Sequence, residues 1–282
     1  MATHEEGRFG GEGGLEIYWQ AWLPEGEPRA VIVLAHGASE HGGRYAWTGE
    51  ELNKRGYAVY AIDHRGHGRS AGDRAVIDRM HNAVEDLHTL VERAQGAYPG
   101  RPLVLLGHSM GGAVALAYTA EHEDALDALV LSGALAVLEA ASPVQRVAGR
   151  VLSVVAPSLG VVAIDSSAVS RDPEVVADYD ADPLNYHGKL PARTVAELSR
   201  AIDRFPDAVT HFRLPMLVMH GTADRLVPIA GSEMVVDRAG SEDKTFKRYD
   251  GLFHEILNEP ERQQVLDDIA DWLDPRFPPA QT

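Results

Sequence analysis

Ser109 lies at the centre of the pattern Gly-x-Ser-x-Gly, with Gly107 and Gly111 on either side of it. Residues 102–106 before the pattern are apolar and of strand length, and residues 113–120 after it favour a helix. A serine in such a strand-to-helix turn is held in a strained conformation, and the small flanking residues let the chain pass so that the hydroxyl projects from the turn. The pattern and its context predict that Ser109 is a nucleophile.

A nucleophilic serine needs a base, and two residues late in the chain fit the roles of base and orienting acid. In enzymes with this turn the partners follow the serine in the order Asp or Glu, then His. His254 follows residues 244–250, which are typical of a last strand, and Asp224 follows a predicted strand at residues 215–220. Because catalytic groups gather at the carboxyl ends of parallel strands, we expect His254 to be the base and Asp224 the acid.

Three other residues compete for these roles. His220 lies at the end of a predicted strand, shortly before Asp224, and is predicted to be structural. His108 precedes the serine and is expected to point away from it, because side chains alternate along a strand. Asp250 is nearer in sequence to the predicted base than Asp224 is, but the loop after the earlier strand is the usual source of the acid.

Backbone N–H groups that would stabilise an oxyanion are predicted at two places. Met110 follows the serine at the start of the predicted helix, where the helix dipole favours negative charge. The second donor is expected in the loop after the apolar run at residues 30–35, where the chain continues His36-Gly37-Ala38. This spacing indicates the N–H of Ala38, and a plain turn is the alternative interpretation of the loop.

Short apolar runs alternate with helical patterns along most of the chain. Runs that are apolar on both faces are typical of a parallel sheet covered by helices, and residues 15–20 alternate as a half-buried strand does. The sequence therefore predicts an α/β fold, with a mostly parallel sheet covered by helices on both faces. The predicted strands also include residues 30–35, 57–62, 102–106, 126–131, 215–219 and 244–250, and the predicted helices include residues 80–94, 113–120 and 265–273.

The alternation of strand and helix patterns stops after the apolar run at residues 126–131. Valines 144, 147, 151 and 154 are spaced as one helix face, and Val195, Leu198, Ile202 and Phe205 as another. Residues 151–164 carry no charge, and they are too few to span a bilayer. The sequence predicts an inserted helical cap at residues 135–210, between two parts of an α/β core at residues 1–134 and 211–282. The alternative is that these apolar faces only pack on the core.

Acidic residues outnumber basic ones by 42 to 26, which gives a formal net charge of −16. A field of this sign repels phosphate backbones, so no nucleic-acid partner is expected. The chain has no cysteine, which excludes disulfides and thiolate chemistry. Its first residues lack the basic and apolar parts of a signal peptide, and no run of about 18 apolar residues occurs. We expect a cytoplasmic protein, or one peripherally associated with a membrane or the cell envelope.

Four motifs carry a family resemblance. HGASEHGGRY at residues 36–45 is the most specific, and the others are DHRGHGRS at 63–70, GHSMGG at 107–112 and HGTADRLVP at 220–228. Together they resemble the monoacylglycerol lipase and lysophospholipase branch of the α/β-hydrolase superfamily, in which the first motif reads HGxxEHxxRY. The resemblance covers nearly the whole chain and implies an α/β-hydrolase fold.

The resemblance implies the triad Ser109, Asp224 and His254, an oxyanion hole of Ala38 and Met110, and a mobile cap over an apolar acyl tunnel. Within the first motif, Glu40 and Arg44 either contact the polar glycerol end or shape the loop that holds the oxyanion donor, and we favour the second role. Mammalian members carry a second histidine three residues after the catalytic one, but this sequence has Leu257 there. The polar contacts to the head group must therefore differ.

These residues predict a serine hydrolase that cleaves monoacylglycerol to free fatty acid and glycerol through an acyl-enzyme on Ser109, with no metal or cofactor. A broad carboxylesterase or a lysophospholipase is the alternative, and an acyltransferase or a peptidase is a further rival on the same fold. A non-catalytic lipid or hormone receptor is disfavoured by the complete triad. The expected partners are monoacylglycerol or a similar single-chain ester and, through residues 151–164, lipid surfaces. The same apolar patch also suits a second subunit, which would make the protein an oligomer.

Overall fold

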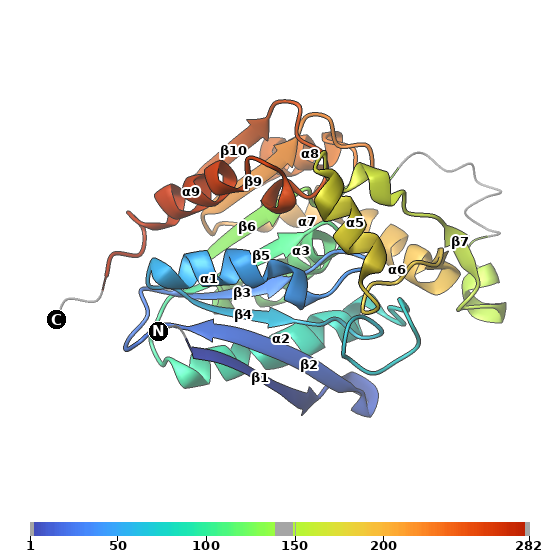
Figure 1. The fold of residues 1–282 in the computed structure, drawn as a ribbon, viewed down its shortest axis with the longest axis horizontal. Helices are drawn as coiled ribbons and strands as arrows, with labels where there is room; N and C mark the ends of the chain where they lie inside the picture. The colour runs from blue at the N-terminus through green and yellow to red at the C-terminus, as the bar shows by residue number, and fades with distance from the viewer. Residues whose placement is uncertain (1–2, 139–148, 150, 280–282) are drawn as a thin grey trace.

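An eight-stranded sheet forms the centre of the protein, in a computed structural model that describes residues 3–138, 149 and 151–279 (Figure 1). The strand order is β1-β2-β4-β3-β5-β6-β9-β10. The strands from β4 to β10 in this order are parallel, whereas β2 is antiparallel to β4 and β1 is antiparallel to β2. The strands are β1 (Thr3–Gly10), β2 (Glu16–Leu23), β3 (Val31–Ala35), β4 (Ala58–Ile62), β5 (Leu103–His108), β6 (Ala128–Ser132), β9 (Met216–Gly221) and β10 (Lys244–Tyr249).

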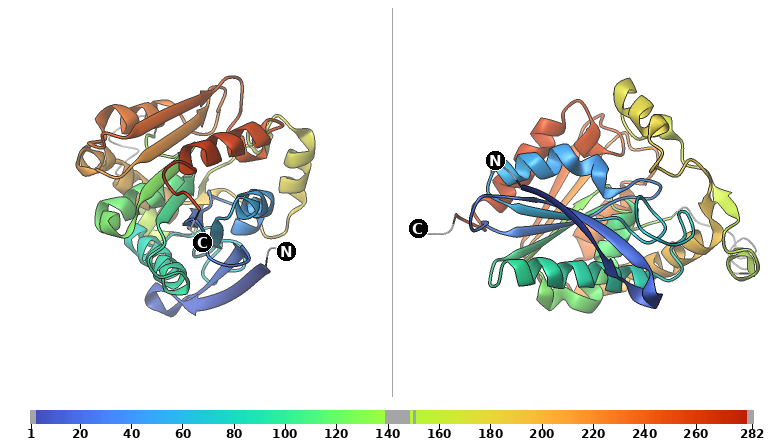
Figure 2. Two further views of the ribbon diagram at one scale, coloured as in Figure 1. Left: turned by 90° about the vertical axis from the view of Figure 1, so that its left-hand side faces the viewer. Right: turned by 60° about the horizontal axis from the view of Figure 1, so that its bottom comes forward.

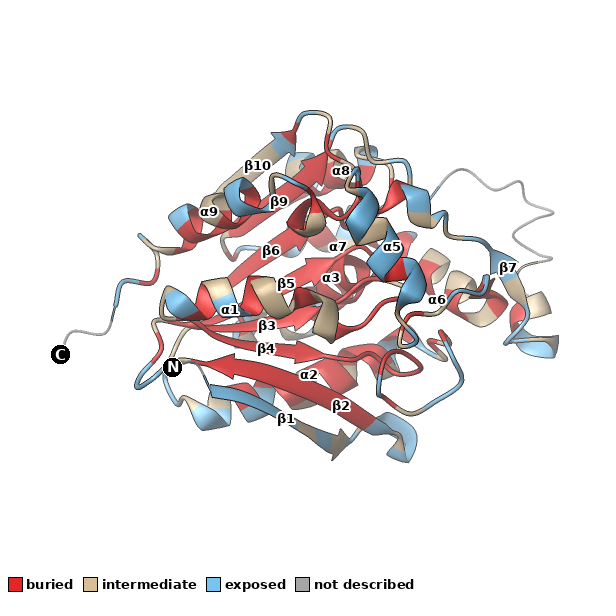
Figure 3. Ribbon diagram, in the orientation of Figure 1, coloured by how far each residue is buried: buried red, intermediate tan, exposed pale blue. Residues whose placement is uncertain are grey.

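Helices cover both faces of this sheet (Figure 2). Alternate residues of each central strand contact opposite helix layers: Val31 and Val33 of β3 belong to one apolar cluster, and Ile32 and Leu34 belong to the other. Apolar residues on both faces of β3 to β6 are therefore buried, which is why these runs fold as interior strands (Figure 3). One layer contains α1 (Ala46–Lys54) and α9 (Arg262–Leu273), and the other contains α2 (Met80–Ala97), α3 (Met110–His122) and α8 (Ala230–Arg238).

The predicted fold class is confirmed, and the amino-terminal region differs from the prediction. Strand β1 was not predicted, because its sequence THEEGRFG is polar and most of its residues are exposed at the edge of the sheet. Strand β2 was predicted to be half-buried, but its residues 17–23 are all buried. The reason is that β2 lies between β1 and β4 and has packing partners on both faces. None of the described helices combines the length and the apolar composition needed to cross a bilayer.

The segment at residues 135–210, called the inserted segment below, connects β6 to β9 and extends beyond one end of the sheet (Figure 1). A short antiparallel pair, β7 with β8, forms within it. Among its described residues are β7 (Gly160–Val162), α5 (Pro173–Ala181), β8 (Leu190–Pro191), α6 (Ala192–Ile202) and α7 (Phe205–Ala208). The short 3-10 helices in the described part of the chain are η1 (Glu12–Gly14), η2 (Gly42–Tyr45), η3 (Glu123–Ala125), η4 (Ser166–Ala168), η5 (Val209–His211) and η6 (Ile256–Asn258).

The two helix faces predicted in the inserted segment have different outcomes. Val195, Leu198 and Ile202 lie on α6, whereas Phe205 begins α7. Residues 151–155 are helical, but Val151 and Val154 are exposed. Positions 144 and 147 of that predicted face lie outside the described residues. The division into a core at 1–134 and 211–282 with a cap at 135–210 stays a prediction.

Candidate functional site

Ser109 lies in a sharp turn between β5 and α3, in a conformation that a non-glycine residue rarely adopts. Its φ is 54° and its ψ is −118°, which costs about 1–3 kcal/mol unless the surroundings hold it in place. The turn fits only because its glycines lack side chains. A Cβ on Gly111 would lie 2.1 Å from the carbonyl oxygen of Ala35 in β3, and one on Gly107 would lie 2.7 Å from the Cβ of Ala115. Close packing of α3 against the sheet therefore holds the strained serine.

His254 and Asp224 are brought together by the loops that follow two neighbouring strands, β10 and β9. His254 Nδ1 lies 2.7 Å from Asp224 Oδ2. The other carboxylate oxygen accepts hydrogen bonds from the backbone N–H groups of Leu226 at 2.8 Å and Val227 at 2.9 Å. This arrangement fixes the carboxylate, which in turn orients the imidazole with its Nε2 available to a second partner.

The charges of this pair shift both of its pKa values. Burial alone would lower the pKa of His254, but the charge and hydrogen bond of Asp224, together with the charges of Glu255 and Glu40, raise it above the ordinary value. Burial alone would raise the pKa of Asp224, but His254, His220 and the Val227 N–H lower it well below its usual range. Asp224 therefore stays ionised across the neutral range and stabilises a positive charge on His254.

Two of the competing residues have partners that give them other roles than those of base and orienting acid. Asp250 is hydrogen-bonded to the hydroxyl of Thr222 at 3.1 Å rather than to His254. His220 is fully buried, with Nδ1 2.8 Å from the Ser232 hydroxyl and Nε2 3.1 Å from both the Val227 carbonyl and Asp224 Oδ2. His220 thus contacts the same carboxylate oxygen, Asp224 Oδ2, that holds the imidazole of His254.

His108 was expected to point away from the site, and this prediction is wrong. Its side chain lines the same cavity as Ser109, and its ring centroid lies 4.7 Å from that of His254. Alternation itself holds, because His108 shares the sheet face of Val104 and Leu106 and packs near Tyr45. The prediction failed because His254, from a distant loop, lies on that same side. Burial, reinforced by the nearby His254, lowers the pKa of His108 to about 3, so the ring is neutral at physiological pH.

The two residues predicted to donate to the oxyanion, Ala38 and Met110, line the same cavity as Ser109. Met110 begins α3, so its N–H has no partner within the helix. The N–H of Ala38 makes no hydrogen bond to any described residue. A Cβ on the preceding Gly37 would lie 3.1 Å from the Cβ of Ser109, so the loop after β3 passes directly beside the serine. Ala38, Ser109 and Met110 all line one cavity.

Glu40, Arg44 and Glu255 form a buried charged cluster beside this cavity. Arg44 donates to the two oxygens of Glu255 at 2.6 and 2.8 Å, and to Glu40 Oε2 at 2.9 Å. The other oxygen of Glu40 accepts the Gly37 N–H at 2.5 Å and the Tyr45 hydroxyl at 2.8 Å. Glu40 therefore joins two positions of the loop after β3, Gly37 and Tyr45, by hydrogen bonds, and this supports a role in shaping that loop.

The cluster also sets the charge at the cavity wall, because Glu40 and Glu255 line the cavity. Burial raises the pKa of Glu40, although Arg44 acts in the opposite direction. Burial would also raise the pKa of Glu255, but the charge and hydrogen bonds of Arg44 lower it below its ordinary value. With all three groups ionised, the cluster carries one net negative charge.

The cavity has a volume of about 180 Å³ and lies between the carboxyl ends of the central strands and the inserted segment. Its polar end holds Ser109, His254 and the two glutamates, and the rest of its wall is mainly aliphatic. The aliphatic lining comes largely from the inserted segment and from the loop after β9: Leu135, Leu138, Val162, Ala163, Ile164, Val169, Leu190, Val195, Leu198, Leu226 and Val227. This shape suits a ligand with one polar end and one apolar chain.

Three side chains elsewhere could share a metal ion. His81 and Glu85 of α2 and Glu121 of α3 place donor atoms within 4.8 Å of one another. Glu121 lies 12 residues after Ser109, or about 18 Å along α3 at 1.5 Å per residue. None of the three lines the cavity, so an ion held there would not contact the serine.

Two residues of the cavity wall were missed by sequence reasoning. Glu255 directly follows the predicted base and was not recognised, because a single acidic residue in a loop carries no pattern. Tyr179 of α5 lines the cavity, and the Arg44 guanidinium lies 4.8 Å from its ring centroid. No local signal links Tyr179 to a residue so distant in the chain. The motif at residues 36–45 was the one available pointer to this cluster.

Comparison with known proteins extends these observations to the whole chain. Residues 26–261 match the hydrolase family described as serine aminopeptidase, S33. A monoacylglycerol lipase from Mycolicibacterium smegmatis is 46% identical over 273 residues, which are 96% of this chain and 98% of that protein. A monoglyceride lipase from Homo sapiens is 37% identical over 273 residues, which are 95% of this chain and 90% of that protein.

Solved structures give the same result. The crystal structure of Paleococcus ferrophilus monoacylglycerol lipase has a TM-score of 0.80 at 27% identity, covering 96% of this chain and 98% of that chain. A soluble variant of monoglyceride lipase from Saccharomyces cerevisiae, in complex with a substrate analogue, has a TM-score of 0.85 at 23% identity and covers 98% of this chain and 96% of that chain. The similarity in fold therefore covers nearly the whole chain.

Proposed function

This chain belongs to the serine aminopeptidase, S33, family of hydrolases, and we propose that it is a monoacylglycerol lipase, a carboxylic ester hydrolase that releases free fatty acid and glycerol. The observation that carries the proposal is the pairing of His254 Nδ1 with Asp224 Oδ2 at 2.7 Å, at the polar end of a mainly aliphatic cavity that Ser109 also lines. The names of the similar lipases from Mycolicibacterium smegmatis and Homo sapiens support the substrate.

The proposed reaction proceeds through an acyl-enzyme. Ser109 Oγ attacks the ester carbonyl while His254 Nε2 takes the hydroxyl proton, and Asp224 stabilises the resulting imidazolium. The N–H groups of Ala38 and Met110 donate to the oxyanion. The imidazolium then gives its proton to the departing glycerol oxygen, and a water molecule, deprotonated by the same imidazole, hydrolyses the acyl-enzyme to the fatty acid.

The inserted segment acts in this proposal as a cap that holds the acyl chain. Val162, Ile164 and Leu198 are among its aliphatic residues in the cavity wall, and burying an apolar chain against them contributes about 25 cal/mol per Å² removed from water. In this proposal the cavity holds a single acyl chain, and the enzyme would then favour a monoester over diacylglycerol and triacylglycerol.

The charge at the polar end favours an uncharged head group. Glu40 and Glu255 line this end, and among the described residues Arg44 is the one cation that forms ion pairs with them, so the phosphate of a lysophospholipid would be repelled. Glycerol hydroxyls are hydrogen-bond donors that carboxylates accept. Leu257 is buried in an apolar cluster and is not among the residues that line the cavity.

The test is hydrolysis of monoacylglycerol, diacylglycerol, triacylglycerol and a lysophospholipid of equal chain length, together with an aminoacyl anilide, by the wild type and by Ser109→Ala. We expect strong preference for the monoacylglycerol, with kcat lowered at least about 10⁴-fold in the variant.

The other outcomes identify the alternatives. Equal hydrolysis of all the lipids, still lost in Ser109→Ala, would make the protein a broad carboxylesterase. Preference for the lysophospholipid would contradict the argument from charge, and cleavage of the anilide alone would favour a peptidase. Full activity in the variant would contradict the assignment of the nucleophile.

We further propose that the cap makes reversible contact with a lipid surface. All the large hydrophobic side chains that stand exposed among the described residues lie in the inserted segment: Leu138, Val151, Val154, Val155, Leu159, Val161 and Val162. Val162 and Leu138 also line the cavity, so the exposed patch borders its entrance. A substrate with one acyl chain resides in lipid, and an apolar rim placed on that lipid would receive it directly.

This contact is tested with the double variant Val154→Asp and Val155→Asp, two positions that are each 70% exposed. Binding to neutral phosphatidylcholine vesicles in a flotation assay should fall at least about fivefold, because each carboxylate would have to leave water. The control is Gln263→Glu with Gln264→Glu, which adds two charges to exposed positions on α9. Unchanged binding in the cap variant, or equal loss in the control, would contradict the proposal.

A further inference from the structure

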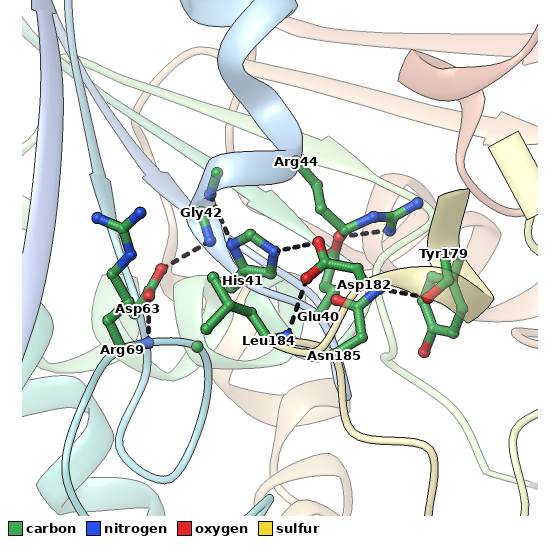
Figure 4. Close-up of polar contacts among 12 residues, drawn as sticks. Glu40, His41, Gly42, Arg44, Asp63, Arg69, Tyr179, Asp182, Leu184 and Asn185 are labelled. Carbon is green, nitrogen blue, oxygen red and sulfur yellow. Dashed lines mark hydrogen bonds and ion pairs between the residues drawn. The ribbon is translucent and has the colours of Figure 1, made fainter. Parts of the chain in front are cut away.

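The middle of the inserted segment is hydrogen-bonded directly to the loop that carries the predicted oxyanion donor. This loop runs from His36 to Tyr45, between β3 and α1, and is called the oxyanion loop here. It meets α5 and the turn that follows α5 up to Tyr186. Figure 4 shows the contacts, with His41 of the loop between Asp63 on the core side and Asp182 on the inserted segment.

The first bonds are made by Ser39, the residue after Ala38. Its carbonyl oxygen accepts the backbone N–H of Tyr186 at 2.9 Å and the hydroxyl of Tyr179 at 3.4 Å. Ser39 also has a φ of 63°, in the left-handed region that a non-glycine residue occupies only when its surroundings hold it there. Two donors from the inserted segment supply that constraint next to Ala38.

The second link joins His41 to Asp182. His41 Nδ1 accepts the backbone N–H of Gly43 at 3.1 Å, so Nε2 carries the proton and donates it to Asp182 Oδ2 at 2.8 Å. The other oxygen of Asp182 accepts the N–H of Leu184 at 2.8 Å, which fixes the carboxylate in its own turn. His41 is 7% exposed, so water competes little for this hydrogen bond.

The core holds the loop from the opposite side. The Asp63 carboxylate accepts the N–H of Gly42 at 2.8 Å and that of Arg69 at 2.8 Å. The loop is therefore bound both to the core, through Gly42, and to the inserted segment, through Ser39 and His41. Ala38 lies just before these attachments, and its own N–H is left without a partner among the described residues.

We propose that His41 and Asp182 are positioning residues, which place the Ala38 N–H for the oxyanion by fixing the loop to the inserted segment. This inference rests on the proposed function, because it takes Ala38 as an oxyanion donor. The consequence is that the inserted segment contributes to the rate of the chemical step, through α5, in addition to enclosing the acyl chain.

Two substitutions break this link with little change elsewhere. In His41→Asn the shorter side chain can still accept the Gly43 N–H, as asparagine does at helix starts, but cannot reach Asp182. In Asp182→Asn the amide oxygen can still accept the Leu184 N–H, but its NH₂ group then faces the His41 donor. Because both variants remove the same bond, the double variant should be no slower than either single one.

Arg74→Ala is the matched control. Arg74 donates to the carbonyl of Leu184 at 2.7 Å and to that of Gly68 at 3.0 Å. It therefore ties the same turn of the inserted segment to the core without touching the oxyanion loop. Loosening of the inserted segment in general would appear in this control, whereas displacement of the oxyanion loop would not.

The readouts are kcat and KM with a monoacylglycerol, and Ki for two inhibitors with the same alkyl chain, a trifluoromethyl ketone and an alcohol. The ketone forms a tetrahedral adduct with an oxyanion, and the alcohol does not. We expect both asparagine variants to lower kcat about tenfold with KM within twofold, since a displaced donor costs less than the ~10²–10³-fold of a removed one. Ki should rise about tenfold for the ketone and stay unchanged for the alcohol, with Arg74→Ala within twofold of the wild type throughout.

Several results would overturn the proposal. These are an unchanged Ki for the ketone, equal loss of affinity for both inhibitors, or the same effects in Arg74→Ala. If His41→Asn unfolds at the assay temperature, Asp182→Asn gives the same measurement. Failure of the proposed function can be told apart from failure of this inference. The ketone reports on the oxyanion site of any serine hydrolase, even if the wild type cleaves no monoacylglycerol.

Discussion

Replacing Asp224 with asparagine should lower kcat about 10⁴-fold while the fold is retained. The amide oxygen of asparagine can keep the two backbone bonds from Leu226 and Val227. Its NH₂ group would then face His254 Nδ1, which lies 2.7 Å from the carboxylate in the native protein. The imidazole would have to present Nδ1 as an acceptor and carry its proton on Nε2. A protonated Nε2 cannot take the proton of Ser109.

The same variant should also shift the pH dependence of the remaining activity. The proposed base works as the neutral imidazole, so activity is lost as pH falls through the pKa of His254. Asp224 raises that pKa against the lowering effect of burial, and removing its charge should lower the pKa. The acid limb of kcat/KM in Asp224→Asn should therefore lie at lower pH than in the wild type. A limb that stays in place would indicate that another group controls it.

Asp250→Asn is the control for this experiment. Asp250 was the rival acid in the sequence, and its carboxylate is bonded to Thr222 in the structure. We expect its kcat to stay within twofold of the wild type. Near-normal turnover in Asp224→Asn combined with a large loss in Asp250→Asn would reverse the two assignments.

Replacing Arg44 with alanine should lower the free energy of unfolding by about 3–5 kcal/mol, the usual cost of leaving a buried charge unpaired. Arg44 is the cation between Glu40, which is 2% exposed, and Glu255, which is 5% exposed. Without it, two buried carboxylates face each other with no compensating charge. Urea denaturation followed by tryptophan fluorescence measures the change, provided that the slope with denaturant is unchanged.

Two further variants separate this structural role from direct binding of glycerol. Adding Glu255→Gln to Arg44→Ala should recover part of the lost stability, because it removes one of the unpaired charges. Arg225→Ala is the control, since Arg225 is exposed and packs over the ring of Phe253 at 4.6 Å. We expect it to change the free energy of unfolding by less than about 0.5 kcal/mol. If Arg44→Ala instead keeps its stability and raises KM only for glycerol esters, Arg44 contacts the head group.

The interior of the fold could be predicted because its signals are local. Each of the strands β3, β5 and β6 is a short apolar run. A strand that is apolar on both faces is stable only in the interior of a sheet that helices cover on both sides. The serine turn was equally visible, since its glycines are required by the close approach of α3 to β3 and β5. Strand β1 could not be found in the same way, because an exposed edge strand needs no apolar face.

The predicted site was incomplete where contacts depend on distant parts of the chain. His254 and Asp224 were found through their order and the strands before them, although neither residue stands in a local pattern with the other. His41 and Asp182 are 141 positions apart, and nothing near Asp182 indicates a partner in the oxyanion loop. Alternation gave the correct sheet face for His108, but it could not show that the distant His254 packs on that same face.

The crowding around Gly111 determines where this protein can accept change. Every substitution there begins with the same Cβ, and that atom would lie 2.1 Å from the Ala35 carbonyl oxygen whatever side chain follows it. In a saturation library, selection for activity on any ester should therefore return only glycine at this position, while Gly96, with nothing within 4 Å of an added Cβ, should accept many residues. Positions such as Val162 and Leu198, in the aliphatic wall of the cavity, are where altered chain-length preference can evolve without loss of the nucleophile.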